Sequence, residues 1–301
     1  MAGEQPYRAF RHFVALAGQR TEPWRTTAGI AIYVLCAFSL LPMVVEAFLS
    51  PAAYERLRDG NTPGMVVARL AITGFDILIL AMLVRRLHGR PARSLIGDPI
   101  RAAEGFVSSV FLCLALLLTV YFLPPWIVED YELRRWWVWA LWLIPAVPML
   151  FIQVTSEEMF FRGYIQQQLA AKSQSRLVWM ILPSVLFGLP HFFNGATPVE
   201  GVMAIIATGF VGLACADLTA RHGTIGPAIG LHMAYNAIAI LVFGVETRLM
   251  SGLALIFFKV PDVAMPDLGS PESIALIIVG SVMTGMTTWT LWLTARFAIR
   301  R

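Results

Sequence analysis

The chain has 301 residues, of which 57% are hydrophobic and only 14% are charged. Soluble domains carry about 45–50% apolar and about 25% charged residues. This composition excludes a disordered chain, a collagen and a coiled coil, and it argues against a soluble enzyme. The net charge of +4 is small, and the arginines are scattered between apolar runs, a pattern that does not indicate nucleic-acid binding. We therefore expect a polytopic membrane protein.

Residues 1–25 form a polar N-terminal segment without the apolar core and cleavage site of a secretory signal. Its aromatic and basic residues fall on different helix faces, which indicates an interfacial amphipathic helix, with a frayed tail as the alternative. Residues 26–301 are predicted to form a single all-α transmembrane domain of about eight helices around an intramembrane polar cavity. The predicted spans are 27–48, 64–84, 106–123, 136–154 (continuing as a helix to about 170), 177–190, 199–218, 225–245 and 274–295.

Positively charged residues predict the orientation of these spans. Arginine and lysine are more frequent in the N-terminal segment and in every second connection after it than in the other connections. Because cytoplasmic loops carry this excess, we expect cytoplasmic N- and C-termini. The apolar segment 249–260 is too short to span a membrane and is interpreted as an interfacial or re-entrant piece. The preference for arginine over lysine suggests a bacterial gene, and hence the bacterial inner membrane.

Ionisable side chains inside apolar spans cost about 2.5–3.5 kcal/mol each at a helix centre, so each needs a reason. The first cluster, Glu157-Glu158-Met159-Phe160-Phe161-Arg162, follows the fourth span. Glu158 and Arg162 are four residues apart, so they share a helix face and can pair. Glu157 is rotated by about 100° from Glu158 and is expected to face something else. An ordinary charge cluster at the membrane interface is the alternative.

Two further clusters contain histidine. His191 ends the fifth span just after Pro190, which disfavours helix at the residue before it. His232 and Asn236 are four residues apart in the seventh span and point the same way. Their structural alternatives are an interfacial role for His191 and hydrogen bonding between helices for His232 and Asn236.

Gathered in one cavity, these side chains would contain the parts for hydrolysis of an amide: a base, a proton carrier and oxyanion donors. Glu157 would deprotonate water, and His232 and Asn236 would donate to the oxyanion. Two histidines with glutamates also suit zinc by ligand type. However, the zinc-protease helix motif with two histidines four residues apart is absent, as is a Gly-x-Ser-x-Gly nucleophile elbow. We therefore expect no cofactor, with zinc as a possible but disfavoured ligand of this site.

The three clusters together resemble the motifs of a known family. In order they match Glu-Glu-x-x-x-Arg at 157–162, Phe-x-x-x-His at 187–191 and His-x-x-x-Asn at 232–236. These motifs are similar to those of the CAAX proteases and bacteriocin-processing enzymes, the CPBP or ABI family, over about residues 135–245. The resemblance implies a membrane-embedded endopeptidase that acts on a peptide or a membrane protein in the lipid bilayer.

The resemblance also implies a role for each matched residue. Glu157 activates water, and His191 helps to hold and polarise it. His232 and Asn236 stabilise the oxyanion. Glu158 and Arg162 order the site.

Other functions stay open at this point. One is a zinc-dependent version of the protease. Another is a non-catalytic membrane scaffold or regulator that uses the same polar cluster for helix packing. A transporter or ion pathway is a third, because intramembrane acids and histidines also mark proton relays.

Overall fold

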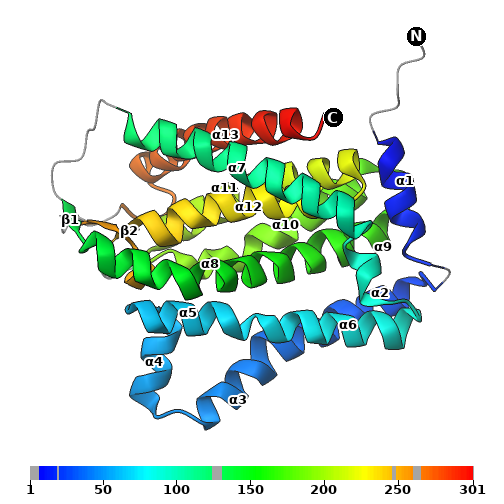
Figure 1. Cartoon of the computed structure of the whole chain (residues 1–301), viewed down its shortest axis with the longest axis horizontal. Coiled ribbons are helices and arrows are strands. Elements are labelled where there is room, and N and C mark those ends of the chain that lie inside the picture. The colour runs from blue at the N-terminus through cyan, green and yellow to red at the C-terminus, as the bar shows by residue number, and fades with distance from the viewer. Residues whose placement is uncertain (1–6, 19, 124–130, 246–248, 260–265, 301) are drawn as a thin grey trace.

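The structure is a computed structural model, and its helices lie side by side in a bundle (Figure 1). The residues that it describes are 7–18, 20–123, 131–245, 249–259 and 266–300. Residues 1–6 of the predicted N-terminal segment lie outside the described residues. In chain order the elements are α1 (Arg8–Ala15), α2 (Pro23–Leu35), η1 (Cys36–Leu40), α3 (Leu41–Ala47), α4 (Pro51–Asp59), α5 (Pro63–Ile72), α6 (Gly74–His88), η2 (Ala92–Leu95), α7 (Pro99–Phe122), β1 (Tyr131–Leu133), α8 (Trp136–Glu158), η3 (Met159–Gln166), α9 (Gln167–Ala170), η4 (Leu177–Ile181), α10 (Leu182–Gly188), η5 (Leu189–Asn194), α11 (Pro198–His222), α12 (Gly226–Ala237), η6 (Ile238–Val242), β2 (Phe243–Val245), η7 (Ser251–Leu253), β3 (Ile256–Phe258) and α13 (Pro271–Ala298).

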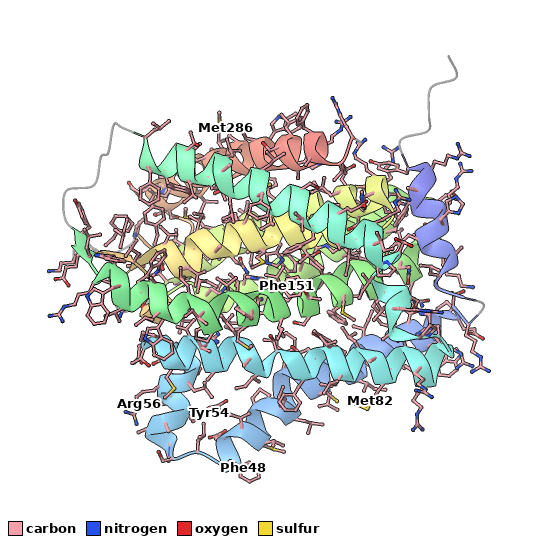
Figure 2. All side chains as sticks on the ribbon, in the orientation of Figure 1. Phe48, Tyr54, Arg56, Met82, Phe151 and Met286 are labelled. Carbon is pink, nitrogen blue, oxygen red and sulfur yellow. The ribbon has the colours of Figure 1, made fainter. Side chains whose placement is uncertain are left out.

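Within the described ranges, seven helices are long and apolar enough to cross a membrane. They are Pro23–Ala47, Pro63–His88, Pro99–Phe122, Trp136–Ala170, Leu177–Asn194, Pro198–His222 and Pro271–Ala298. The chain is therefore an all-α polytopic membrane protein, as predicted. Large apolar side chains such as Phe48, Met82 and Met286 point away from the bundle (Figure 2), which suits contact with lipid tails.

The predicted span 225–245 differs from the other seven. It forms a shorter helix, Gly226–Val242, in which α12 continues into the π-helical turn η6. At Phe243 the backbone becomes extended and enters β2. Every residue from Gly226 to Ala234 is buried, because other helices surround α12. The described residues therefore contain seven long apolar helices and this shorter central one, where the sequence predicted about eight spans.

The segment 249–260 is not a helical span in its described residues. It contains the turn η7 and strand β3, which lies between the other two strands in the order β1-β3-β2. Strand β3 is antiparallel to β1 and parallel to β2. Arg134 secures the segment by donating hydrogen bonds to the carbonyl oxygens of Ala254 and Gly252, at 3.0 and 2.9 Å. This short sheet lies at one end of the bundle (Figure 1).

Helix α1 packs on the other end of the bundle (Figure 1). Its Phe10 and Phe13 are buried, and the Phe10 ring lies 4.7 Å from that of Trp179. Tyr7 donates a hydrogen bond to Asp217 of α11 at 2.6 Å, and Gln167 of α9 donates to the carbonyl oxygen of Phe13 at 2.7 Å. The apolar face of α1 is thus covered by protein. The position of this helix relative to the membrane surface stays a prediction.

The central helix α12 approaches α7 closely through glycine. Gly226 and Gly230 are four residues apart on α12 and both face α7. A Cβ atom at Gly230 would lie 2.7 Å from the carbonyl oxygen of Phe106 and 2.8 Å from the Cβ of Ser109. Small residues spaced by four let membrane helices pack backbone to backbone. This contact fixes the position of α12 along α7. Because His232 lies two residues after Gly230 on the same helix, the contact also helps to place the His232 side chain.

We expect Gly230→Ala to lower the free energy of unfolding by about 1–3 kcal/mol, the usual cost of overpacking a core. Unfolding in mixed micelles would measure this change. Gly209→Ala is the matched control, because a Cβ there meets only the carbonyl oxygen of Ser184 at 4.0 Å. Equal stability of the two variants would contradict the argument.

Candidate active site

The candidate site begins at the junction between α8 and the π-helical segment η3. The carboxylates of Glu157 and Glu158 are the last two side chains of α8, and Arg162 lies in η3. π-Helical turns inside longer helices often occur at functional sites. The Glu158 side chain is 0% exposed, whereas that of Glu157 is 28% exposed. The two adjacent carboxylates therefore have different surroundings.

Glu158 and Arg162 form a buried ion pair. Arg162 Nη1 donates to Glu158 Oε1 at 2.8 Å, and the Arg162 side chain is 1% exposed. Arg162 Nη2 donates to the carbonyl oxygen of Gly212 in α11, also at 2.8 Å. The guanidinium carbon lies 4.7 Å from the ring centre of Phe187, in a cation–π contact. The predicted pair is present, and it connects η3 to α10 and α11.

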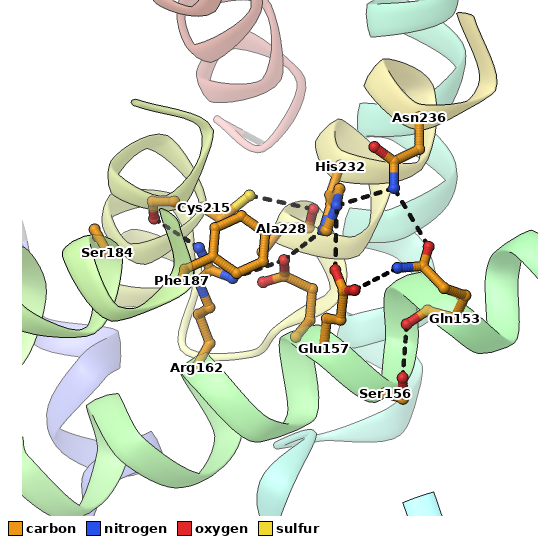
Figure 3. A network of polar contacts seen from close by, with 12 residues as sticks. Gln153, Ser156, Glu157, Arg162, Ser184, Phe187, Cys215, Ala228, His232 and Asn236 are labelled. Atoms are coloured by element: carbon orange, nitrogen blue, oxygen red, sulfur yellow. Dashed lines mark hydrogen bonds and ion pairs between the residues drawn. The ribbon is translucent and has the colours of Figure 1, made fainter. Parts of the chain in front are cut away.

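His232 lies between the two glutamates. Its Nδ1 donates to Glu158 Oε1 at 2.8 Å, and its Nε2 lies 3.6 Å from Glu157 Oε2 (Figure 3). Asn236 Nδ2 approaches the same Nε2 at 3.2 Å and donates to it. A carboxylate that already pairs with Arg162 accepts rather than donates, so Nδ1 carries the proton in this arrangement.

Gln153 completes a chain of polar contacts one turn before Glu157. Its Nε2 donates to Glu157 Oε1 at 2.5 Å, and its Oε1 accepts from Asn236 Nδ2 at 3.3 Å (Figure 3). Glu157 Oε2 has no hydrogen-bond partner among the described residues and faces His232. Glu157 Oε1 is therefore held by Gln153, while Oε2 is a buried oxygen beside His232 that lacks a donor.

His191 lies beside this network, on η5. Its Nδ1 donates to the carbonyl oxygen of Phe187 at 2.9 Å, which leaves Nε2 as an acceptor. The Phe187 ring contacts both imidazoles, with its centre 5.1 Å from that of His191 and 5.4 Å from that of His232. His191 also interacts electrostatically with Glu157 and His232. In the described part of the chain, no hydrogen bond joins it to the other five predicted site residues.

The nitrogen and oxygen atoms that could bind zinc in this site are largely occupied by contacts within the protein. Both ring nitrogens of His232 are already in hydrogen bonds, and the Glu158 carboxylate pairs with Arg162. Over the described residues, no group of three or more His, Cys, Asp or Glu side chains is arranged to hold a metal ion. The donor set therefore does not fit a zinc ion without breaking these contacts.

Comparison with known proteins bears on the same region. Residues 135–238 match the family described as type II CAAX prenyl endopeptidase Rce1-like. The family resemblance is confirmed. The uncharacterized protein YyaK of Bacillus subtilis (strain 168) is 25% identical over 218 residues, which cover 69% of each chain. No solved structure matches the chain significantly.

The Rce1-like match indicates an endopeptidase of the CAAX protease type, embedded in the membrane. The matched region contains α8, η3, α10, η5, α11 and α12. Among the described residues, these elements supply all six of the predicted site residues. Such an enzyme works in a lipid bilayer on a peptide or protein substrate.

Sequence reasoning missed two parts of the site. Gln153 had a usable signal, because it stands four residues before Glu157 on the same helix. The carbonyl oxygen of Gly212 had none, since a backbone acceptor on another helix leaves no trace in residue type. The sequence predicted that Glu157 does not pair with Arg162, and the contacts agree. The hydrogen bond from Gln153 to Glu157 was not predicted.

Proposed function

We propose that this protein is an intramembrane endopeptidase that hydrolyses a peptide bond with water activated by Glu157. The supporting observation is the buried Glu157 Oε2, which has no hydrogen-bond partner among the described residues and lies 3.6 Å from His232 Nε2, in one network with Asn236. A carboxylate with one free oxygen can accept a proton from water. The side chains beside it can donate to the oxygen that becomes charged.

The proposed reaction has two steps. Glu157 Oε2 takes a proton from water while the water oxygen bonds to the peptide carbonyl carbon. The resulting oxyanion accepts hydrogen bonds from Asn236 Nδ2 and from His232 Nε2. For this the His232 ring takes up a second proton from bulk water before the first step and keeps it throughout, so that Nε2 donates and the N–H of Asn236 that it accepted from is released to the oxyanion. The carbonyl forms again as the carbon–nitrogen bond breaks, and the leaving nitrogen takes the proton from Glu157.

The other site residues support these steps. His191 Nε2, left free by the bond from Nδ1 to Phe187, accepts a hydrogen bond from the attacking water. Glu158 fixes the His232 ring through Nδ1, and Arg162 neutralises Glu158 in turn. In our proposal the N- and C-termini lie in the cytoplasm of a bacterium and the protein lies in its inner membrane, in agreement with the distribution of arginine and lysine.

The test is cleavage by the purified protein in lipid nanodiscs, with defined peptides whose cysteine, followed by three C-terminal residues, is or is not prenylated. Mass spectrometry identifies the products, and Glu157→Gln is the matched control. We expect cleavage of at least one peptide by the wild-type protein alone. A protein without activity, or a Glu157→Gln variant as active as wild type, would favour a scaffold instead.

We also expect the zinc chelator 1,10-phenanthroline to leave this cleavage unchanged, because the His232 nitrogens and Glu158 are already paired within the protein. The non-chelating 1,7-phenanthroline controls for effects on the lipid. Loss of activity with the first compound alone, restored by added zinc, would replace the glutamate mechanism by a zinc-dependent one.

A further inference from the structure

Gln153 contacts two parts of the proposed machinery at once. Its amide nitrogen donates to Glu157 and its amide oxygen accepts from Asn236, so it bridges α8 and α12. A single side chain can do this only if it has both a donor and an acceptor. A primary amide has both, whereas a carboxylate has no donor and an alkyl chain has neither.

The bridge makes the two oxygens of Glu157 unequal. Oε1 accepts the hydrogen bond from Gln153 at 2.5 Å, while Oε2 has no hydrogen bond among the described residues. A lone pair held in a hydrogen bond is less available to take a proton. The contact therefore leaves Oε2, on the side of His232, as the oxygen that can act as a base.

The same bridge fixes how the Asn236 amide is turned. Because Gln153 Oε1 accepts from Asn236 Nδ2, the nitrogen of Asn236, and not its oxygen, faces this side of the network. The same nitrogen lies 3.2 Å from His232 Nε2, where the proposed oxyanion would take its hydrogen bonds. A reversed amide would present an acceptor to a negatively charged oxygen, which is unfavourable.

We infer that Gln153 is a positioning residue for peptide hydrolysis, which selects the basic oxygen of Glu157 and orients the Asn236 donor. This inference rests on the proposed function. Gln153 acts through its two neighbours and does not itself touch the reacting atoms. The competing interpretation is a purely structural contact between α8 and α12.

Gln153→Leu removes both hydrogen bonds at similar volume. We expect kcat to fall on the order of 10²-fold, the effect of a small misplacement of reacting groups, with KM and the melting temperature close to wild type. Gln153→Met is the second variant if leucine impairs folding, because it keeps the unbranched chain. Thr155→Val is the matched control: its hydroxyl, on the same helix, has no hydrogen-bond partner among the described residues.

A double-mutant cycle separates positioning from packing. If Gln153 acts through Asn236, Gln153→Leu and Asn236→Ala together should lower kcat by much less than the product of their separate effects. Two results would overturn the inference: a wild-type kcat in both Gln153 variants, or a fall in kcat that only follows a fall in melting temperature. In either case the low activity of Glu157→Gln would show that the proposed function itself still holds. Failure of the proposed function would give a different result: a Glu157→Gln variant as active as wild type, or a wild-type protein without activity. Either result would also refute the role of Gln153.

Discussion

Replacing Glu157 by glutamine is expected to lower kcat for peptide cleavage by about 10²–10⁴-fold, the usual contribution of a positioned general base. Glutamine keeps the shape of the side chain but cannot take a proton from water. The fold should tolerate this change, because the Glu157 side chain is 28% exposed and is not part of the ion pair with Arg162. Single-turnover cleavage in nanodiscs measures the rate, and the melting temperature of the purified protein measures the fold.

The neighbouring Glu158→Gln variant is the matched control for this prediction. It makes the same chemical change one residue along the chain, but it leaves the buried guanidinium of Arg162 without its carboxylate. We expect a clear drop in melting temperature for Glu158→Gln and none for Glu157→Gln. Cleavage by Glu157→Gln at the wild-type rate would contradict the assignment of the base, whatever the stability of either variant.

Much of the bundle could be predicted from the sequence, because lipid imposes a length and a composition on each spanning helix. The exception was the shorter central helix, in which residues 226–234 are all buried. α12 is enclosed by protein, so its length follows from packing against α7 and from its exit into β2. The three-residue strands were not predicted, because segments this short carry no periodicity of their own.

The local part of the candidate site could also be predicted. Spacing by four along one helix places Glu158 beside Arg162 and His232 beside Asn236, and both contacts are present. Contacts between helices could not be derived in this way. The hydrogen bond from His232 to Glu158 joins residues 74 positions apart, and only the tertiary fold brings them together. The motif resemblance named these residues but not the atoms that meet.

Replacing Arg162 by methionine is expected to lower the free energy of unfolding by about 3–5 kcal/mol, the cost of leaving a buried charge unpaired. The Glu158 carboxylate, which is fully buried, would then lose its cationic partner while it still accepts from the His232 imidazole. The Gly212 carbonyl would also lose its hydrogen bond, and the Phe187 ring would lose its cation contact. Reversible unfolding in mixed micelles would measure the change.

The double variant Glu158→Gln with Arg162→Met decides whether charge or packing causes this loss. Removing both charges leaves no unpaired ion, and replacing a whole buried pair by neutral side chains is often close to neutral in stability. We therefore expect the double variant to be more stable than Arg162→Met alone. Activity should stay low in both variants, because the double variant lacks the Glu158 carboxylate that holds His232 Nδ1, and Arg162→Met leaves that carboxylate without its cation. A double variant as unstable as Arg162→Met would mean that the cation stabilises the site through Gly212 and Phe187, and not through Glu158.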